Sequence, residues 1–207
     1  NETDIMIFKS NSVLDIKQVQ NLIRIKKLKI LDFGCGVGVW SQKNLKNKNI
    51  KKITLYDKNK GLIKILKKKY NQKKVEINFN FKDIIRKRNY NLVIISSVIQ
   101  YIDIIKFKKL IEIISKSKKK RKEKLFIIIT DIPILPRPFE FVLMPFFNLK
   151  RFFFIFKMVF TNKYKKLNYY LHKKQDFYFL RKKFNIMYAQ NIGDVKYLRY
   201  SLILKLM

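Results

Sequence analysis

The chain of 207 residues is 48% hydrophobic and 30% charged, a composition that excludes a disordered protein and allows a core burying about 70% of the unfolded chain's surface. Its formal net charge of +34 would normally indicate nucleic acid or an anionic membrane as a partner. The enriched residue types, Lys, Asn, Ile, Phe and Tyr, have A/T-rich codons, so we interpret most lysines as solvated surface groups, with RNA or lipid binding as the alternative.

Cysteine and histidine are too rare to build a disulfide or a Cys/His metal site. Cys35 is the only cysteine and His172 the only histidine, so no internal disulfide can form and no metal centre is expected. The first residues, NETDIMIFKSN, include acids and lack the apolar segment of a secretion signal, so we expect a cytoplasmic protein. The sequence does not begin with Met, and its natural start is left open.

In chain order, the sequence first predicts a helix over 12–25, because apolar residues recur there at helical spacing. Short apolar runs and helical patterns then alternate. We predict strands at 30–33, 52–56, 75–79, 91–96 and 125–130, and helices at 38–47, 59–70 and 104–116, with a loop or short helical turn before the strand at 91–96. This alternation indicates an α/β fold with a Rossmann-like, mostly parallel sheet covered by helices on both faces. Such a sheet binds ligands at the carboxyl ends of its strands.

The C-terminal part has a different pattern. A predicted helix at 174–183 leads into two strand-like runs, FNIMYAQNI and YLRYSLILKL, separated by a polar loop. These runs predict a terminal antiparallel strand pair. Because no repeat or flexible linker divides the chain, we interpret residues 1–207 as a single domain with an aromatic and basic insertion at about 132–172.

The insertion opens with PILPRP, which stops regular structure, and continues with many aromatic residues. A membrane-spanning helix is not expected, because proline and basic residues interrupt its apolar run: Pro145, Lys150, Arg151 and Lys157. A helix here would gather five apolar side chains on one face: Phe152, Phe153, Phe156, Val159 and Phe160. Two interpretations stay open. The helix is a lid packed on the domain, or residues 146–160 form a cationic helix that lies on a membrane or grips an apolar substrate.

The stretch ILDFGCGVGVW places Gly34, Gly36 and Gly38 at every second position after a short apolar run. The third glycine comes one residue too early for a dinucleotide-binding fingerprint, and no Lys-Ser pair follows as in a nucleoside-triphosphate loop. LDFGCGVG resembles the first motif of class I S-adenosylmethionine-dependent methyltransferases, acidic-x-G-x-G-x-G. The resemblance implies that Asp32 and the backbone from Gly34 through Cys35 to Gly38 hold the amino-acid part of that cofactor. Glycine suits this role, because without a Cβ the backbone can approach a ligand closely.

Further residues stand where this resemblance requires them. Asp57 follows the second predicted strand, where the family's acidic residue binds the ribose hydroxyls. Asp83 and the backbone of Ile84 resemble the pair that reads adenine, although Asp83 could instead cap a helical turn. The stretch SSVIQYI, beginning at Ser96, is similar to the family's S-x-V-L-x-H-I signature and implies a place for Ser96 in the cofactor site. It departs from that signature at Tyr101, where many relatives carry His.

The resemblance implies an S-adenosylmethionine-dependent methyltransferase. Methyl transfer depends mainly on positioning, and the candidates for a catalytic side chain are Tyr101, Asp131 and His172. No D/N/S-P-P-aromatic motif follows the fourth predicted strand, and Cys35 lies in the glycine loop, so DNA is not expected as the acceptor. We expect a small-molecule, saccharide or lipid-linked acceptor. The alternatives are a tRNA methyltransferase and a non-catalytic module that binds RNA or an anionic membrane. A contact of residues 146–160 with a membrane would place this cytoplasmic protein peripherally at the inner membrane face.

Overall fold

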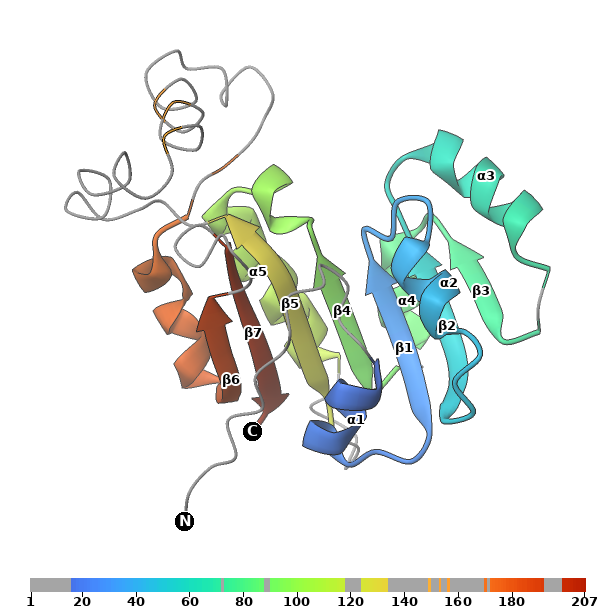
Figure 1. The fold of residues 1–207 in the computed structure, drawn as a ribbon, viewed down its shortest axis with the longest axis horizontal. Helices are drawn as coiled ribbons and strands as arrows, with labels where there is room; N and C mark the ends of the chain where they lie inside the picture. The colour runs from blue at the N-terminus through green and yellow to red at the C-terminus, as the bar shows by residue number, and fades with distance from the viewer. Residues whose placement is uncertain are drawn as a thin grey trace.

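The computed structural model describes residues 16–71, 73–87, 90–117, 124–133, 149, 153, 156, 170, 172–191 and 199–207. These residues form one seven-stranded sheet with the strand order β3-β2-β1-β4-β5-β7-β6 (Figure 1). The strands are β1 (Leu28–Phe33), β2 (Ile50–Tyr56), β3 (Val75–Asn78), β4 (Leu92–Ser96), β5 (Phe126–Pro133), β6 (Phe184–Asn191) and β7 (Arg199–Leu206).

Helices flank the sheet on both faces. They are α1 (Ile16–Ile23), α2 (Val39–Asn44), α3 (Lys60–Lys69), α4 (Phe81–Lys87) and α5 (Ile104–Lys116), with 3-10 helices η1 (Ile99–Tyr101) and η2 (Lys174–Lys182). Alternate residues of each strand face opposite sides. In β1, Leu31 packs in the core beneath α4, α5 and η2, whereas Ile30 packs in the core beneath α1, α2 and α3. Both faces of the central strands are therefore buried, which explains their nearly continuous apolar sequence.

Strands β1 to β5 pair in parallel, and β7 pairs antiparallel with both β5 and β6. The predicted α/β fold with a mostly parallel sheet and a terminal antiparallel pair is confirmed. The connections from β1 and β4 leave in opposite directions along the sheet, because β2 lies on one side of β1 and β5 on the far side of β4. Such a switch point opens a crevice at the carboxyl ends of the strands.

Several predicted boundaries differ from the observed ones for local reasons. β1 begins at Leu28 and not at residue 30, because Leu28 and Lys29 already pair with β2. α2 ends at Asn44, whose side-chain amide donates to the carbonyl of Trp40 at 2.8 Å. The predicted loop or helical turn before β4 is the helix α4. β5 continues to Pro133, so the insertion begins later than residue 132, because Ile132 and Pro133 pair with β7.

Most of the 132–172 insertion, including the helix expected at 146–160, lies outside the described residues. Of that stretch, Leu149, Phe153 and Phe156 are described; they are helical and exposed. The C-terminal end of the insertion is fixed to the sheet, because the backbone N–H of His172 donates to the carbonyl of Pro133 at 3.0 Å. Among the described helices, none combines the length and the apolar character needed to cross a membrane.

Candidate functional site

The glycine loop at the end of β1 turns sharply over the carboxyl edge of the sheet. Gly34, Gly36 and Gly38 have φ angles of 73°, 55° and 75°, a left-handed conformation that glycine adopts without steric cost. The backbone N–H groups of Gly34 and Cys35 both donate to the carbonyl of Tyr56, at 2.7 and 3.0 Å. The loop is thereby tied to the end of the neighbouring strand β2.

The three glycines meet different surroundings. A Cβ added to Gly34 would lie 2.4 Å from Cγ2 of Val98, and one added to Gly38 would lie 2.9 Å from the hydroxyl of Tyr70. Among the described residues other than its chain neighbours, a Cβ added to Gly36 would meet no heavy atom within 4 Å. The outer two glycines are therefore required by protein packing, whereas Gly36 borders open space that a ligand can occupy.

Asp57 lies directly against this loop. Its Oδ2 accepts the backbone N–H of Gly36 at 3.0 Å, and its Oδ1 accepts the backbone N–H of Asn59 at 2.9 Å. Only 9% of the residue is exposed. These two bonds fix the carboxylate beside the open space at Gly36, and a carboxylate can accept further hydrogen bonds at each oxygen.

Asp32 is held beneath the loop, on the α2 side of β1. It is 3% exposed, and Ser41 of α2 donates to its Oδ2 at 2.6 Å. Burial raises the pKa of Asp32 to about 6, an effect that the Ser41 hydrogen bond opposes and the charge of Asp57 increases. A buried carboxyl with this pKa is poised to ionise when a cation approaches.

Ser96 and Thr130 are paired across β4 and β5, and Thr130 donates to the hydroxyl of Ser96 at 2.9 Å. Ser97 follows Ser96 at the end of β4, and Asp131 follows Thr130 in β5. The hydroxyl of Ser97 donates to Oδ2 of Asp131 at 2.5 Å. A second group of polar side chains thus stands at the carboxyl edge, on the β4–β5 side of the switch point.

A family model described as the methyltransferase small domain matches residues 12–129, more than half of the chain. The chain belongs to the class I S-adenosylmethionine-dependent methyltransferases. No curated protein matches the methyltransferase sequence.

Solved structures share the fold of this methyltransferase at low sequence identity. Magnesium protoporphyrin IX methyltransferase (ChlM) from Synechocystis, with bound SAH, is 15% identical over 93% of this chain and 81% of its own, with a TM-score of 0.60. A SAM-dependent methyltransferase from Methanosarcina mazei is 14% identical over 94% and 99%, with a TM-score of 0.63. The N-methyltransferase NodS from Bradyrhizobium japonicum, in complex with S-adenosyl-L-homocysteine, is 10% identical over 100% and 93%, with a TM-score of 0.57.

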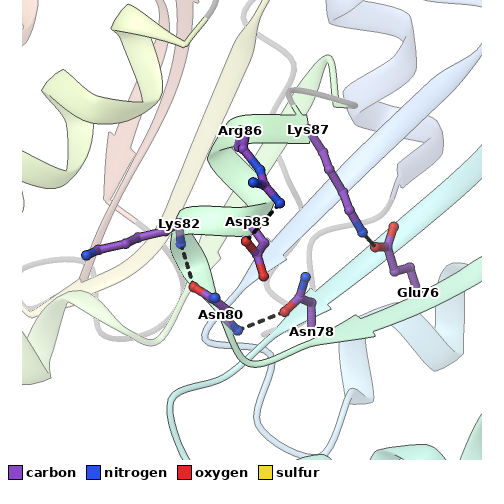
Figure 2. Close-up of polar contacts among 7 residues, drawn as sticks. All are labelled: Glu76, Asn78, Asn80, Lys82, Asp83, Arg86 and Lys87. Atoms are coloured by element: carbon purple, nitrogen blue, oxygen red, sulfur yellow. Dashed lines mark hydrogen bonds and ion pairs between the residues drawn. The ribbon is translucent and has the colours of Figure 1, made fainter.

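Asp83, expected to read adenine, lies in the first turn of α4 and forms an ion pair with Arg86 at 3.4 Å (Figure 2). Asn80 stands closer to the end of β3. Its side-chain oxygen accepts the backbone N–H of Lys82 at 3.1 Å, while its own backbone N–H donates to Asn78 at 2.8 Å. The methyltransferase therefore presents an asparagine amide at the end of β3, one helical turn before Asp83.

Ile84, the second residue expected at the adenine, is 3% exposed and its side chain belongs to the core. Its backbone N–H donates to the carbonyl of Asn80 at 3.3 Å. The amide that would read a ring nitrogen already has a partner within the protein. The expected role of Ile84 in this methyltransferase stays a prediction. It requires the backbone N–H of Ile84 to donate to adenine as well as to the carbonyl of Asn80.

Cys35 and Tyr101 differ in exposure. Cys35 is half-buried in the glycine loop, and burial, together with the charges of Asp32 and Asp57, raises the pKa of its thiol far above the usual range. The thiol is therefore protonated and unreactive. Tyr101 ends η1 and is 54% exposed, so its ring faces solvent next to the methyltransferase site.

His172 occupies neither the surface nor the glycine loop. It is 2% exposed, its Nε2 lies 3.1 Å from the carbonyl of Ile99, and its ring packs edge-on against Phe177 at 5.6 Å. The structure buries His172 between η1, β5 and η2. These contacts anchor the residue, at the C-terminal end of the insertion, to the sheet.

Lowering the pH is expected to loosen this anchor. Burial lowers the pKa of His172, while the Ile99 carbonyl and the charges of Asp176 and Asp103 raise it less. The unfolded chain therefore binds this proton more readily, and the stability that His172 contributes above pH 6.5 is lost as the pH falls. His172→Phe keeps the ring but cannot titrate. Thermal denaturation between pH 8 and pH 5 should show a smaller loss of Tm on acidification in this variant, and equal losses would contradict the assignment.

Three site residues were not among those predicted from the sequence. Ser41 holds Asp32, Ser97 holds Asp131, and the hydroxyl of Tyr70 donates to the carbonyl of Gly38 at 2.7 Å. Ser97 directly follows Ser96 in the recognised signature, but only its left-handed φ of 56° distinguishes it from its neighbour. Nothing in the spacing of Tyr70, at the end of α3, indicates a contact with the glycine loop. Among the described residues, no group of three His, Cys, Asp or Glu side chains could hold a metal ion.

Proposed function

We propose that this protein binds S-adenosylmethionine and transfers its methyl group to a small-molecule, saccharide or lipid-linked acceptor. The observation that carries the proposal is the open space over Gly36, beside the Asp57 carboxylate. Oδ2 of Asp57 accepts the backbone N–H of Gly36 at 3.0 Å. A glycine whose Cβ position is empty, beside a fixed acceptor of hydrogen bonds, fits a nucleoside sugar that lies against the backbone.

The distribution of charge supports a cationic ligand. Although the chain carries a net charge of +34, one aspartate lies at or after the carboxyl end of each parallel strand: Asp32, Asp57, Asp83, Asp103 and Asp131. Asp83 and Asp103 form ion pairs with basic residues of their own helices. Within the described part of the chain, Asp32 and Asp57 receive hydrogen bonds from neutral donors alone. The Asp32 and Asp57 carboxylates thus place negative charge at the glycine loop, where a sulfonium and an ammonium group would bind. Lys69 also contacts this loop, because its exposed Nζ donates to the carbonyl of Val37 at 3.1 Å.

Each residue of the loop has a distinct task in this proposal. Asp57 holds the two ribose hydroxyls, Asp32 faces the ammonium group, and the backbone from Gly34 to Gly38 accommodates the carboxylate end of the ligand. Asn80 or Asp83 reads the adenine, and Ser96 lies at the crevice between the two halves of the sheet. When bound, S-adenosylmethionine supplies a methyl group activated by a positively charged sulfur, so these residues need only bind and orient it.

A small acceptor is supported by the name of one structural neighbour, which is named for magnesium protoporphyrin IX. Phe153 and Phe156 are exposed, and we propose that these two side chains form part of one wall of the acceptor site. The competing function is a binding module without catalysis, which would need no cofactor.

Isothermal titration calorimetry with S-adenosylmethionine and with S-adenosylhomocysteine tests the proposal. Saturable binding of both ligands, with no binding of adenosine triphosphate as a charge-reversed control, is the expected result. No heat from either ligand at millimolar concentration would leave the binding module as the function. Incubating cell extract with isotope-labelled S-adenosylmethionine, followed by mass spectrometry, would then identify the acceptor.

Cofactor affinity is expected to fall in acid because of Asp32. A bound cation favours the ionised carboxylate, so the pKa of Asp32 in the complex lies below its value of about 6 in the free protein. Binding must then release a proton below pH 6, and affinity should be about tenfold weaker at pH 5 than at pH 7. Calorimetry in two buffers of different ionisation enthalpy measures that proton. Asp32→Asn should bind more weakly at pH 7 and show no such pH dependence; an unchanged pH profile in the variant would remove Asp32 from the ligand's surroundings.

A further inference from the structure

Ser97 and Asp131 share an unusual backbone conformation. Their φ angles are 56° and 62°, and among the described residues other than glycine only Arg24 shares this left-handed region, with φ 50°. A side chain in that region costs on the order of 1–2 kcal/mol. Ser97 and Asp131 are neighbours at the carboxyl edge, whereas Arg24 lies at the opposite edge, between α1 and the start of β1. Two residues with a strained backbone conformation therefore lie side by side at one place in the site.

The two residues are held in register by their strands. Ser96 and Thr130 are the last paired residues of β4 and β5, and the backbone N–H of Ser97 still donates to the carbonyl of Thr130 at 3.2 Å. On its other side, β5 shifts register against β7 between Ile129 and Ile132. Such a bulge re-aims a side chain, and here the re-aimed residue is Asp131, which meets the hydroxyl of Ser97.

The pair is adjacent to the glycine loop, and exposed apolar residues follow it in the sequence. Val98, which follows Ser97, packs against Gly34 closely enough to exclude a Cβ there. Tyr101 and Ile105, in the segment that leaves the end of β4, are 54% and 64% exposed. A polar pair beside the loop, followed by an exposed aromatic and an exposed aliphatic residue, fits a ligand with one hydrogen-bonding group on an apolar skeleton.

We propose that Asp131, oriented by Ser97, binds the methyl acceptor, and that the acceptor presents an amine or a hydroxyl on an apolar skeleton. This inference rests on the function proposed above. The Asp131 carboxylate accepts the N–H or O–H hydrogen bond and repels carboxylate acceptors. Asp131 is the catalytic residue, and Ser97 is a positioning residue whose hydroxyl fixes the carboxylate.

The reaction balances without another reagent. The lone pair of the acceptor nitrogen or oxygen forms the bond to the methyl carbon, and the carbon–sulfur bond of the donor breaks with its electron pair left on sulfur. The proton of the acceptor passes to Asp131 and then to solvent. A positioned base of this kind contributes roughly 10²- to 10⁴-fold to the rate of such a transfer.

Three probes that share a benzyl group and differ in their polar group test the acceptor class on protein saturated with S-adenosylhomocysteine: benzylamine, benzyl alcohol and phenylacetate. Ligand-observed NMR titrations give their relative affinities. Benzylamine, benzyl alcohol or both should bind at least tenfold more tightly than phenylacetate, and the stronger of the two identifies nitrogen or oxygen as the acceptor atom. No preference over phenylacetate, or no binding of any probe at 50 mM, would overturn the proposal.

Asp131→Asn keeps the shape and tolerates the left-handed backbone, so it should remain folded, bind S-adenosylhomocysteine normally and lose the preference. Glu112→Gln is the charge control, because Glu112 lies on α5 in ion pairs with Lys116 and Lys183; its preference should be unchanged. Equal losses in both variants would show a general charge effect and overturn the role of Asp131. If the wild type did not bind S-adenosylhomocysteine, that result would instead refute the proposed function itself.

Ser97→Gly separates positioning from stability. It relieves the left-handed conformation, as Arg24→Gly does at the opposite edge, so both variants should have a Tm equal to or above that of the wild type. Only Ser97→Gly should reduce the preference for benzylamine or benzyl alcohol over phenylacetate, by about threefold to tenfold. Ser97→Asn, which tolerates the left-handed backbone and keeps a side-chain N–H donor, should recover part of it. An unchanged preference in Ser97→Gly would remove Ser97 from the site.

Discussion

Replacing Gly36 with alanine is expected to abolish binding of S-adenosylmethionine while the protein stays folded. The new Cβ would enter the open space over the loop, since no heavy atom of the described residues beyond its chain neighbours lies within 4 Å of it, and would occupy the volume proposed for the ligand. The remaining cost is the left-handed φ of 55°, about 1 kcal/mol. Calorimetry should show at least a hundredfold loss of affinity, and thermal denaturation only a small fall in Tm.

Gly34→Ala is the matched comparison in the same loop. Its Cβ would lie 2.4 Å from Val98, so the change adds a steric overlap in the packed crevice to the cost of φ 73°. We expect a destabilisation of about 3 kcal/mol or more. If Gly36→Ala bound the cofactor at the affinity of the wild type, the loop would not be the binding surface.

Replacing Asp57 with alanine is expected to weaken cofactor binding about tenfold or more, because hydrogen bonds to a charged group contribute on the order of 1.5–3 kcal/mol. The variant also loses the two bonds that hold the loop, from Gly36 and Asn59. Asp57→Asn separates these effects. Its amide oxygen can keep the Asn59 bond, but its NH₂ group would face the N–H of Gly36.

Calorimetry and Tm should be measured for both Asp57 variants. We expect weak binding in both, with a smaller loss of stability in Asp57→Asn. Asp83→Asn is the comparison within the same edge of the sheet, because Asp83 already pairs with Arg86 at 3.4 Å. Wild-type affinity in Asp57→Ala would contradict the ribose assignment, whereas a loss in Asp83→Asn would identify Asp83 rather than Asn80 as the residue that reads the adenine.

Much of the site was predictable because the motif residues act through the backbone. A glycine at every second position after a buried strand predicts left-handed turns, and Gly34, Gly36 and Gly38 all adopt them. Asp57 follows its strand directly, and neighbouring parallel strands end at the same edge. Its contact with the loop therefore follows from strand order alone.

The remaining features depend on tertiary contacts that local spacing does not contain. Ile132 and Pro133 resemble the start of a loop, yet they pair with β7, some 66 residues later in the chain. His172 looks like a surface residue beside two lysines, yet Ile99 and Pro133 bury it. Asp131 gains its partner only because β4 and β5 bring Ser97 alongside it. Such contacts override local preference, so the sequence pattern indicates where a strand lies but not which distant residues contact it.

The strand order has a consequence for how the chain is made. β7, the last strand in sequence, sits between β5 and β6, and β6 pairs with no other described strand. While the ribosome is still producing residues 199–207, the growing polypeptide holds β5 with a bare hydrogen-bonding edge and β6 with nothing to join. Nascent chains that do not yet include β7 are therefore the species most exposed to intermolecular strand pairing, and β7 is the strand that seals the sheet.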